Sequence, residues 1–80
     1  IWSDRKTSVM RTQGGPPRRI RTRNCARLAD AILTTTHPEL FDGARRKDAF
    51  ASMRAQVRMT RYGGDCYGYA LLACGFVDLI

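Results

Sequence analysis

The residue best placed to do chemistry is Asp65, which follows two glycines and precedes a run without any charged residue, Cys66 to Cys74. Aspartate is a preferred helix N-cap, because its carboxylate can accept hydrogen bonds from the first backbone N–H groups. A carboxylate at the mouth of a site can instead pair with a cationic ligand. The two roles are compatible, since a capping carboxylate keeps one oxygen free. Both therefore stay open at this point.

The residues around Asp65 extend this candidate binding site. The backbone of Gly64 and the amides from Cys66 onward could contact polar ligand atoms, and Tyr62 is either a pocket wall or a packed aromatic. His37 is the single histidine and so a tempting acid–base group, but its position before a proline favours a turn residue. It could still line a ligand pocket, because it follows the C-terminal end of a predicted strand.

The last third of the chain contains the elements that must position these residues. β-Branched, aromatic and long side chains predict a strand over 57–62, and Gly63 and Gly64 allow a sharp turn after it. The following helix, 66–74, is apolar on nearly every side, which is typical of a helix buried inside a layered protein. Gly75 fits the left-handed residue that ends a helix, and 76–80 is predicted to be a strand.

The upstream part is predicted to supply further strands and helices. Residues 1–17 form a polar, basic arm that ends in the turn Gly14-Gly15-Pro16-Pro17. The elements expected after it are an exposed or edge strand over 18–23, a short helical turn over 24–29, a buried strand over 31–36 and a helix over 44–56 with one apolar face. Strands that alternate with helices indicate layered α/β packing.

The net charge of +7 raises the possibility of a nucleic-acid partner. Up to Asn24 there are seven basic residues against one acidic residue, whereas the rest of the chain has seven against six. The excess therefore lies in one arginine-rich arm, which could contact phosphate backbones. No aromatic residues interleave with these arginines as stacking platforms, and this pattern disfavours nucleic acid.

The cysteines and the hydropathy exclude several other classes. The chain has three cysteines, Cys25, Cys66 and Cys74, and no two of them form a Cys-x-x-Cys pair. A zinc site needs closely spaced Cys and His ligands, and these cysteines and the one histidine are not closely spaced. We expect buried free thiols in a reducing cytoplasm.

No apolar stretch is long enough for a membrane span, and there is no signal-peptide pattern. The chain does not begin with Met and stops within an apolar strand, so we expect it to be a piece of a longer protein.

Two stretches resemble the histidinol-phosphate phosphatases of the inositol monophosphatase superfamily. The first is Arg61-Tyr-Gly-Gly-Asp-Cys-Tyr-Gly-Tyr69 with the segment 71–79 after it. The second is Thr34-Thr-Thr-His-Pro-Glu-Leu-Phe41, which is similar to the family's Thr-Thr-Ser-Pro-x-Leu-Phe. The lead-in segments 21–23 and 28–31 also fit, so the resemblance runs from Arg18 to Ile80. Ordinary inositol monophosphatases carry small or hydroxyl residues where Asp65 stands.

The resemblance implies a layered α/β/α/β/α fold, with a mixed sheet and buried helices. Residues 1–80 would be a single partial domain, the C-terminal half of the catalytic domain. The activity implied is that of a Mg²⁺-dependent phosphomonoesterase that converts histidinol phosphate to histidinol in histidine biosynthesis. Its substrate would be a small phosphorylated molecule whose ammonium group pairs with Asp65.

The family's magnesium ligands come from an upstream Glu, an Asp-Pro-x-Asp-Gly-Thr loop and a downstream Trp-Asp pair. None of these motifs is present in this sequence. We therefore expect no catalytic and no metal-binding residue among these 80, and no turnover by the isolated chain. Its contribution would be substrate recognition, through Asp65, Gly64, Cys66 and Tyr62.

Three other interpretations stay open. They are an inositol or sugar monophosphatase of the same superfamily, a small basic nucleic-acid-binding module, and a truncated paralogue without activity. A homodimer also stays open.

Overall fold

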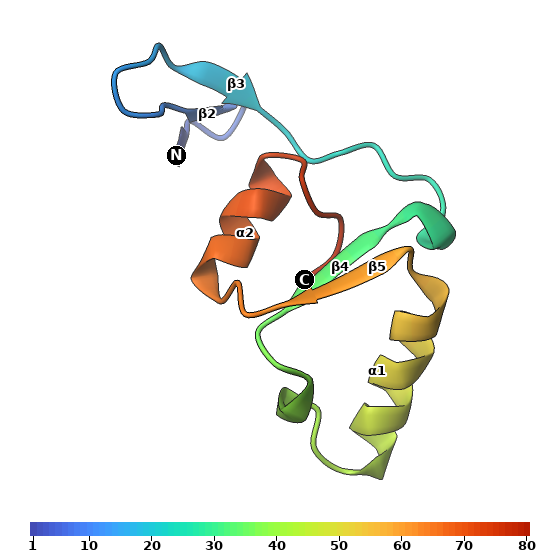
Figure 1. Cartoon of the computed structure of the whole chain (residues 1–80). Helices are drawn as coiled ribbons and strands as arrows, with labels where there is room; N and C mark the ends of the chain where they lie inside the picture. The colour runs from blue at the N-terminus through green and yellow to red at the C-terminus, as the bar shows by residue number, and fades with distance from the viewer.

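A computed structural model describes residues 1–80 as a mixed α/β structure of 46 × 25 × 22 Å (Figure 1). The strands are β1 (Trp2–Ser3), β2 (Ser8–Met10), β3 (Arg18–Ile20), β4 (Ile32–Thr35) and β5 (Met59–Tyr62). The helices are α1 (Ala44–Gln56) and α2 (Cys66–Ala73), and short 3₁₀ turns cover Leu28–Asp30 and Pro38–Leu40. The predicted α/β class is confirmed, and so are strands within 57–62 and 31–36 and the helix over 44–56.

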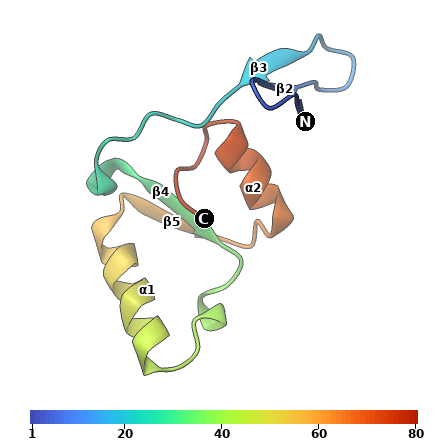
Figure 2. The same cartoon turned by 180° about the vertical axis from the view of Figure 1, so that it is seen from behind.

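A parallel strand pair forms the centre of the molecule. β4 and β5 pair in register from Ile32 opposite Met59 to Thr35 opposite Tyr62, and α1 provides the crossover between them. Figures 1 and 2 show α1 and α2 on opposite sides of this pair. The C-terminal segment runs along the other edge of β4, but only Leu79 forms a bridge there, to Leu33. The strand predicted over 76–80 is therefore reduced to a single bridge.

Helix α1 packs through aromatic side chains. The ring of Phe50 stacks on that of Phe41, with centroids 4.3 Å apart, and meets Tyr62 edge-on at 6.4 Å. Offset and edge-to-face pairs of this kind add stability beyond the apolar area that they bury. They hold α1 against the end of β5. Of the apolar face predicted within this helix only Phe50 is half-buried, whereas Ala49 and Met53 are exposed and α1 has no buried residue.

Helix α2 lies close to β4 because Gly68 has no side chain. A Cβ atom there would stand 2.9 Å from Ile80 Cδ1 and 3.3 Å from Thr34 Cγ2. The helix ends in a Schellman motif at Gly75, whose φ is +82°. The Phe76 N–H donates to the Leu71 carbonyl at 2.9 Å, and the Gly75 N–H donates to that of Leu72 at 3.1 Å. The predicted helix stop at Gly75 is confirmed.

The prediction that α2 is buried is wrong for these 80 residues. Only Gly68 of this helix is buried, and Tyr67 and Tyr69 are 66% and 64% exposed. The reason is the small core, which has six buried residues: Ile20, Ala31, Leu33, Thr34, Gly68 and Val77. No layer of this chain covers the outer side of α2. Neither helix combines the length and the apolar character that a bilayer crossing requires.

A separate antiparallel sheet, in the order β1-β2-β3, occupies the N-terminal end. The glycine-proline turn at Gly14 (φ +77°) connects β2 to β3, and β3 lies at the sheet edge as predicted. Residues 1–17, which were predicted to be a polar arm, contain the additional strand β2. This sheet contacts the C-terminal end of α2, where the Sγ of the C-cap residue Cys74 lies 3.5 Å from Met10 Sδ.

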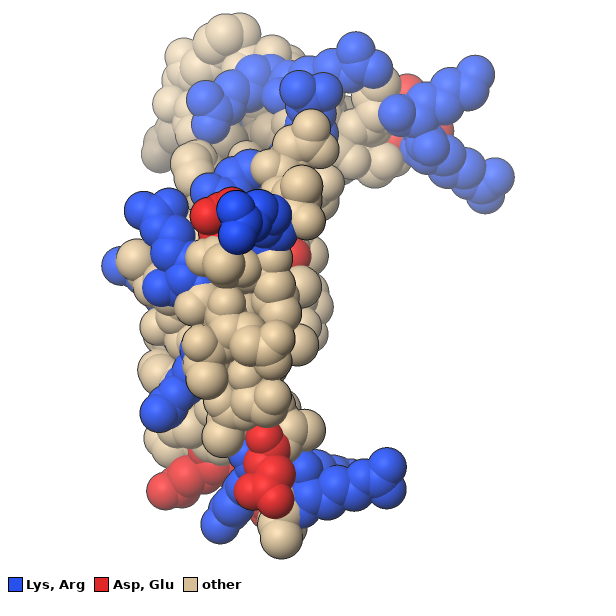
Figure 3. Space-filling model, turned by 90° about the vertical axis from the view of Figure 1, so that its right-hand side faces the viewer, with Lys and Arg blue, Asp and Glu red and all other residues tan.

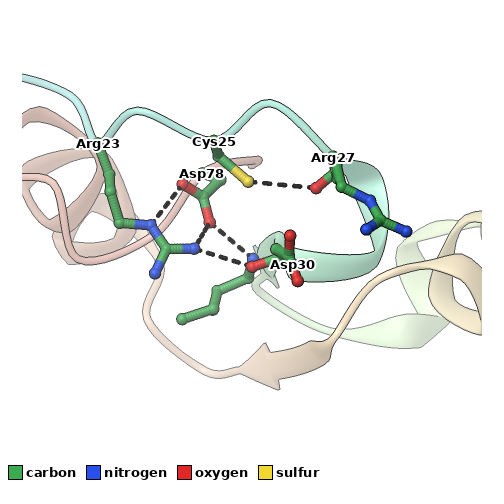
Figure 4. Close-up of polar contacts among 6 residues, drawn as sticks. Arg23, Cys25, Arg27, Asp30 and Asp78 are labelled. Atoms are coloured by element: carbon green, nitrogen blue, oxygen red, sulfur yellow. Dashed lines mark hydrogen bonds and ion pairs between the residues drawn. The ribbon is translucent and has the colours of Figure 1, made fainter.

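The Arg23–Asp78 bridge joins the linker after β3 to the C-terminal segment (Figure 4). Arg23 Nη2 lies 2.6 Å from Asp78 Oδ2, and Arg23 Nε lies 3.0 Å from Oδ1. Asp78 Oδ2 also accepts the N–H of Ile32 at 2.8 Å, while Arg23 Nη2 donates to the Asp30 carbonyl at 2.9 Å. One carboxylate, whose side chain is 6% exposed, thus connects three separate segments.

This bridge makes a pH-dependent contribution to stability. The Arg23 guanidinium, followed by the Ile32 N–H, holds the pKa of Asp78 below its ordinary 3.8. A lowered pKa in the folded state stabilises the fold above the unfolded value, and this stabilisation is lost as pH falls through the folded value. We expect Asp78→Asn to be less stable than the native chain at about pH 7 and to lose less stability between about pH 5 and pH 2.

Urea unfolding followed by far-UV circular dichroism at several pH values measures both effects. Asp4, the other carboxyl group with a lowered pKa, is present in both chains and cancels in the comparison. Parallel stability curves for the two chains between pH 5 and pH 2 would show that the bridge does not hold the fold.

Candidate functional site

The turn between β5 and α2 lies at the C-terminal edge of the parallel strand pair. The Gly63 N–H donates to the Thr36 carbonyl at 2.9 Å, which joins the chain after β5 to the chain after β4. Gly63 has a φ of +84°, a backbone conformation that favours glycine, whereas a Cβ on Gly64 would make only an ordinary contact with the Gly68 nitrogen, at 3.5 Å. Ligands of open α/β sheets bind at this carboxyl edge. The glycines therefore bring the next residue, Asp65, to the edge where a site is expected.

Asp65 has an unusual backbone conformation, with φ +46° and ψ −133°. This is the mirror image of the β region, which glycine populates freely and residues with a Cβ rarely enter. Only one other non-glycine residue of the chain, Arg5, has a positive φ. Such conformations cost free energy and tend to collect at functional sites.

The capping role predicted for the Asp65 carboxylate is wrong. The residue stands at the N-cap position of α2, but its side chain makes no capping hydrogen bond. Capping side chains reach the N2 or N3 amide from a β-region backbone, and the conformation of Asp65 is its mirror image. The carboxylate is exposed and takes part in neither ion pair of the chain. It is therefore free to meet a ligand.

Gly64 and Cys66, predicted with Asp65, flank it directly in the turn. Cys66 begins α2, and its side chain is exposed. The first amides of a helix have no intrahelical partner, so backbone donors are available next to the carboxylate. These three consecutive residues form one polar surface, which is open to solvent apart from the half-buried Gly64.

Tyr62 packs against helix α1. Its ring meets Phe50 of α1, and its hydroxyl accepts a weak hydrogen bond from Arg54 Nη1 at 3.4 Å. The Tyr62 side chain therefore lies on the side of the strand pair that faces α1, although 42% of the residue remains exposed. Its predicted contact with substrate remains a prediction.

His37 is a turn residue, as the following proline indicates. Its Nδ1 accepts the N–H of Glu39 at 3.1 Å and caps the 3₁₀ turn Pro38–Leu40. The residue is exposed and follows β4, so it lies at the same carboxyl edge as Asp65. With Nδ1 engaged, Nε2 is the nitrogen left to face a ligand.

No three side chains of His, Cys, Asp or Glu come together in a group that could hold a metal ion. Magnesium requires several converging oxygen ligands, so the residues of this chain do not fit a magnesium site. The three cysteines are free thiols, but Cys66 is exposed, which contradicts the prediction that all are buried. Its place at the first position of a helix without a covering layer explains this exposure.

Two features of the site region were missed from the sequence. The strained backbone of Asp65 has a signal in hindsight, because Gly-Gly-Asp continues a glycine-type turn by one residue. The ion pair of Asp78 could be expected only in general terms from the sequence, because a single carboxylate within an apolar segment needs a cation as a partner. Nothing in the sequence selects Arg23 from the other arginines.

Comparison with known proteins shows what this geometry is similar to. No family model matches the chain. Over 61 residues, 76% of the chain, it is 51% identical to the bifunctional phosphatase IMPL2, chloroplastic, of Arabidopsis thaliana. Its fold is similar to that of an inositol monophosphatase from Zymomonas mobilis, with a TM-score of 0.69 and 31% identity over 95% of the chain. The chain is thus similar in sequence to the first phosphatase and in both sequence and fold to the second.

These similarities support the resemblance to the inositol monophosphatase superfamily that the sequence motifs predict, and the fold agrees with it. The matched segment is 17% of the plant protein, and the chain spans 32% of the bacterial one. The 61 matching residues exceed the length of the two quoted motifs, so the relationship is broader than one glycine turn.

The strain at Asp65 predicts an unusual response to substitution. Asp65→Gly should stabilise the fold by roughly 1 kcal/mol, because glycine adopts this conformation without a Cβ clash. Asp65→Asn, which keeps the Cβ, should leave stability within about 0.5 kcal/mol of the native value. Urea unfolding of the three chains measures both differences. A loss of stability in the glycine variant would mean that the carboxylate supports the fold.

Proposed function

We propose that this chain is the substrate-recognising part of a phosphomonoesterase that acts on histidinol phosphate. In this role the exposed carboxylate of Asp65 pairs with the ammonium group of the substrate, and the amides beside it bind polar substrate atoms. The observation that carries the proposal is an aspartate held in a strained turn, with its carboxylate free, at the carboxyl edge of the strand pair.

The relatives support the general reaction. One is a bifunctional phosphatase and the other an inositol monophosphatase, and both names denote hydrolysis of phosphate esters. Such an enzyme binds a small phosphorylated substrate. The finer assignment depends on Asp65, because a carboxylate attracts an ammonium group more strongly than a hydroxyl or a methyl group does.

The isolated 80-residue chain is expected to be inactive. Its acidic residues do not converge on a metal, and its three main hollows are lined by residues other than Asp65. The opposite wall of the substrate pocket and the ligands of the proposed Mg²⁺ would therefore come from residues outside these 80. In the whole enzyme, bound Mg²⁺ would activate water and stabilise the leaving oxygen. A reducing cytoplasm remains our expectation for its location.

An inositol or sugar monophosphatase is the second candidate. It is favoured by the similarity of the fold to an inositol monophosphatase over 95% of this chain. The two candidates differ in what they require of Asp65. A polyol phosphate has no cation to pair with a carboxylate, whereas histidinol phosphate has an ammonium group.

Substitution of Asp65 distinguishes them in the enzyme that carries these residues. Asp65→Asn should raise KM for histidinol phosphate by roughly ten-fold or more, because a charge-assisted hydrogen bond is lost. KM for inositol 1-phosphate, a substrate without a cation, should change by less than about two-fold. Phosphate release in the presence of Mg²⁺ measures both values.

Asp48→Asn is the matched control, because Asp48 is an exposed carboxylate of α1 that takes part in neither ion pair. It should leave both KM values unchanged. If Asp65→Asn raised KM equally for the two substrates, the carboxylate of Asp65 would not bind the ammonium group.

A further inference from the structure

We propose that the N-terminal sheet binds small oligoanions, molecules with two or three linked phosphate groups, in a basic hollow on β2 and β3. The hollow has a volume of about 590 Å³, within the range of small-ligand pockets. It is lined by Lys6, Thr7, Ser8, Arg19, Ile20 and Arg21. This hollow belongs to a different sheet from the Asp65 turn, and the inference does not rest on the proposed function.

The three cations of the hollow have no anionic partner in the chain. Its two ion pairs are Arg23–Asp78 and Arg46–Asp42, so Lys6, Arg19 and Arg21 are all unpaired. No carboxylate lines the hollow. Figure 3 shows Lys and Arg side chains gathered over this end of the molecule. Like charges that share a concave surface raise the local potential and attract anions.

Asp4 is the acidic residue nearest in sequence, but it forms no ion pair with Lys6, and one of its carboxylate oxygens is already engaged. Asp4 Oδ1 accepts the N–H groups of Lys6 at 2.9 Å and Thr7 at 2.7 Å, together with the Thr7 hydroxyl at 3.1 Å. These bonds hold the turn between β1 and β2 and leave the Lys6 ammonium free to meet a ligand.

A second hollow extends the site beyond one phosphate group. It is lined by Arg21, Thr22 and Asn24, so Arg21 stands between the two hollows. Hydroxyl and amide groups from Ser8, Thr22 and Asn24 add neutral donors to the guanidinium groups. Guanidinium groups bind phosphate oxygens in a bidentate manner. Three cations on two adjoining hollows therefore fit a ligand with several linked phosphates better than a single orthophosphate.

A small oligoanion fits this surface better than a nucleic acid does. Neither hollow is lined by an aromatic side chain, whereas single-stranded nucleic acids usually stack their bases on aromatic rings. The one tryptophan, Trp2, belongs to β1 and pairs with Val9 of β2, next to the basic strand. It is 52% exposed and gives a fluorescence signal close to the hollow.

The test is a titration of the 80-residue chain with sodium tripolyphosphate at constant ionic strength, followed by Trp2 fluorescence and by calorimetry. We expect saturable binding of one tripolyphosphate per chain and weaker binding of orthophosphate. The variant Arg19→Gln/Arg21→Gln should bind tripolyphosphate at least roughly ten-fold more weakly, because two charge-assisted contacts are lost.

The control is Arg45→Gln/Lys47→Gln, which removes the same charge from exposed, unpaired residues of α1. Its affinity should stay within about two-fold of the native value. Four outcomes would overturn the proposal: no saturable binding, an equal loss in both double variants, binding only of an oligonucleotide, or an equal affinity for orthophosphate. Far-UV circular dichroism of each variant checks whether the native fold is kept.

Discussion

The Arg23–Asp78 bridge is the interaction on which the arrangement of this chain depends. The core holds only six buried residues, so apolar packing alone supplies little cohesion between the N-terminal sheet and the β4–β5 unit. The carboxylate of Asp78 connects these parts, because it accepts hydrogen bonds from the guanidinium of Arg23 in the linker and from the backbone N–H of Ile32 in β4. A bidentate pair whose carboxylate is shielded from water is worth more than a fully exposed ion pair, although the Arg23 side chain is 34% exposed. The bridge adds to the backbone hydrogen bonds that hold the C-terminal segment along β4, in which the Thr34 N–H donates to the Leu79 carbonyl and the Asp78 N–H to the Ile32 carbonyl. Ile80 of that segment meets Gly68 of α2.

This placement determines what the Asp65 turn can do. Because α2 rests on Thr34 and Ile80 through Gly68, its N-terminus is fixed relative to the carboxyl edge of β4 and β5. Two glycines complete the turn, and Asp65 takes a conformation that a third glycine would adopt at lower cost. An aspartate at this position lowers the stability of the fold relative to glycine and places an exposed carboxylate in the turn. This exposed carboxylate is the physical basis of the proposed recognition of a cationic phosphate ester.

Much of the fold could be predicted from local patterns, and the contacts between distant segments could not. Helix 44–56, the β4 and β5 strands and the glycine stop at Gly75 follow from periodicity, β-branched residues and turn chemistry. Strand β2 was missed because Ser8–Met10 is too short to show alternation. The prediction that α2 is buried was wrong. The apolar composition of a helix indicates that it packs under other residues, but it does not show that those residues belong to this chain. For the site, the sequence indicates Asp65 and leaves a capping and a ligand-binding role open, and in the structure its carboxylate makes no capping bond.

The central claim is that a carboxylate at position 65 reads a positive charge on the substrate. The most direct measurement changes the substrate and not the protein. In the native enzyme that carries these residues, kcat/KM is compared for histidinol phosphate and for its analogue without the amino group. A charge-assisted contact predicts a preference of roughly ten-fold or more for the amine. Equal kcat/KM values for the two esters would contradict the claim.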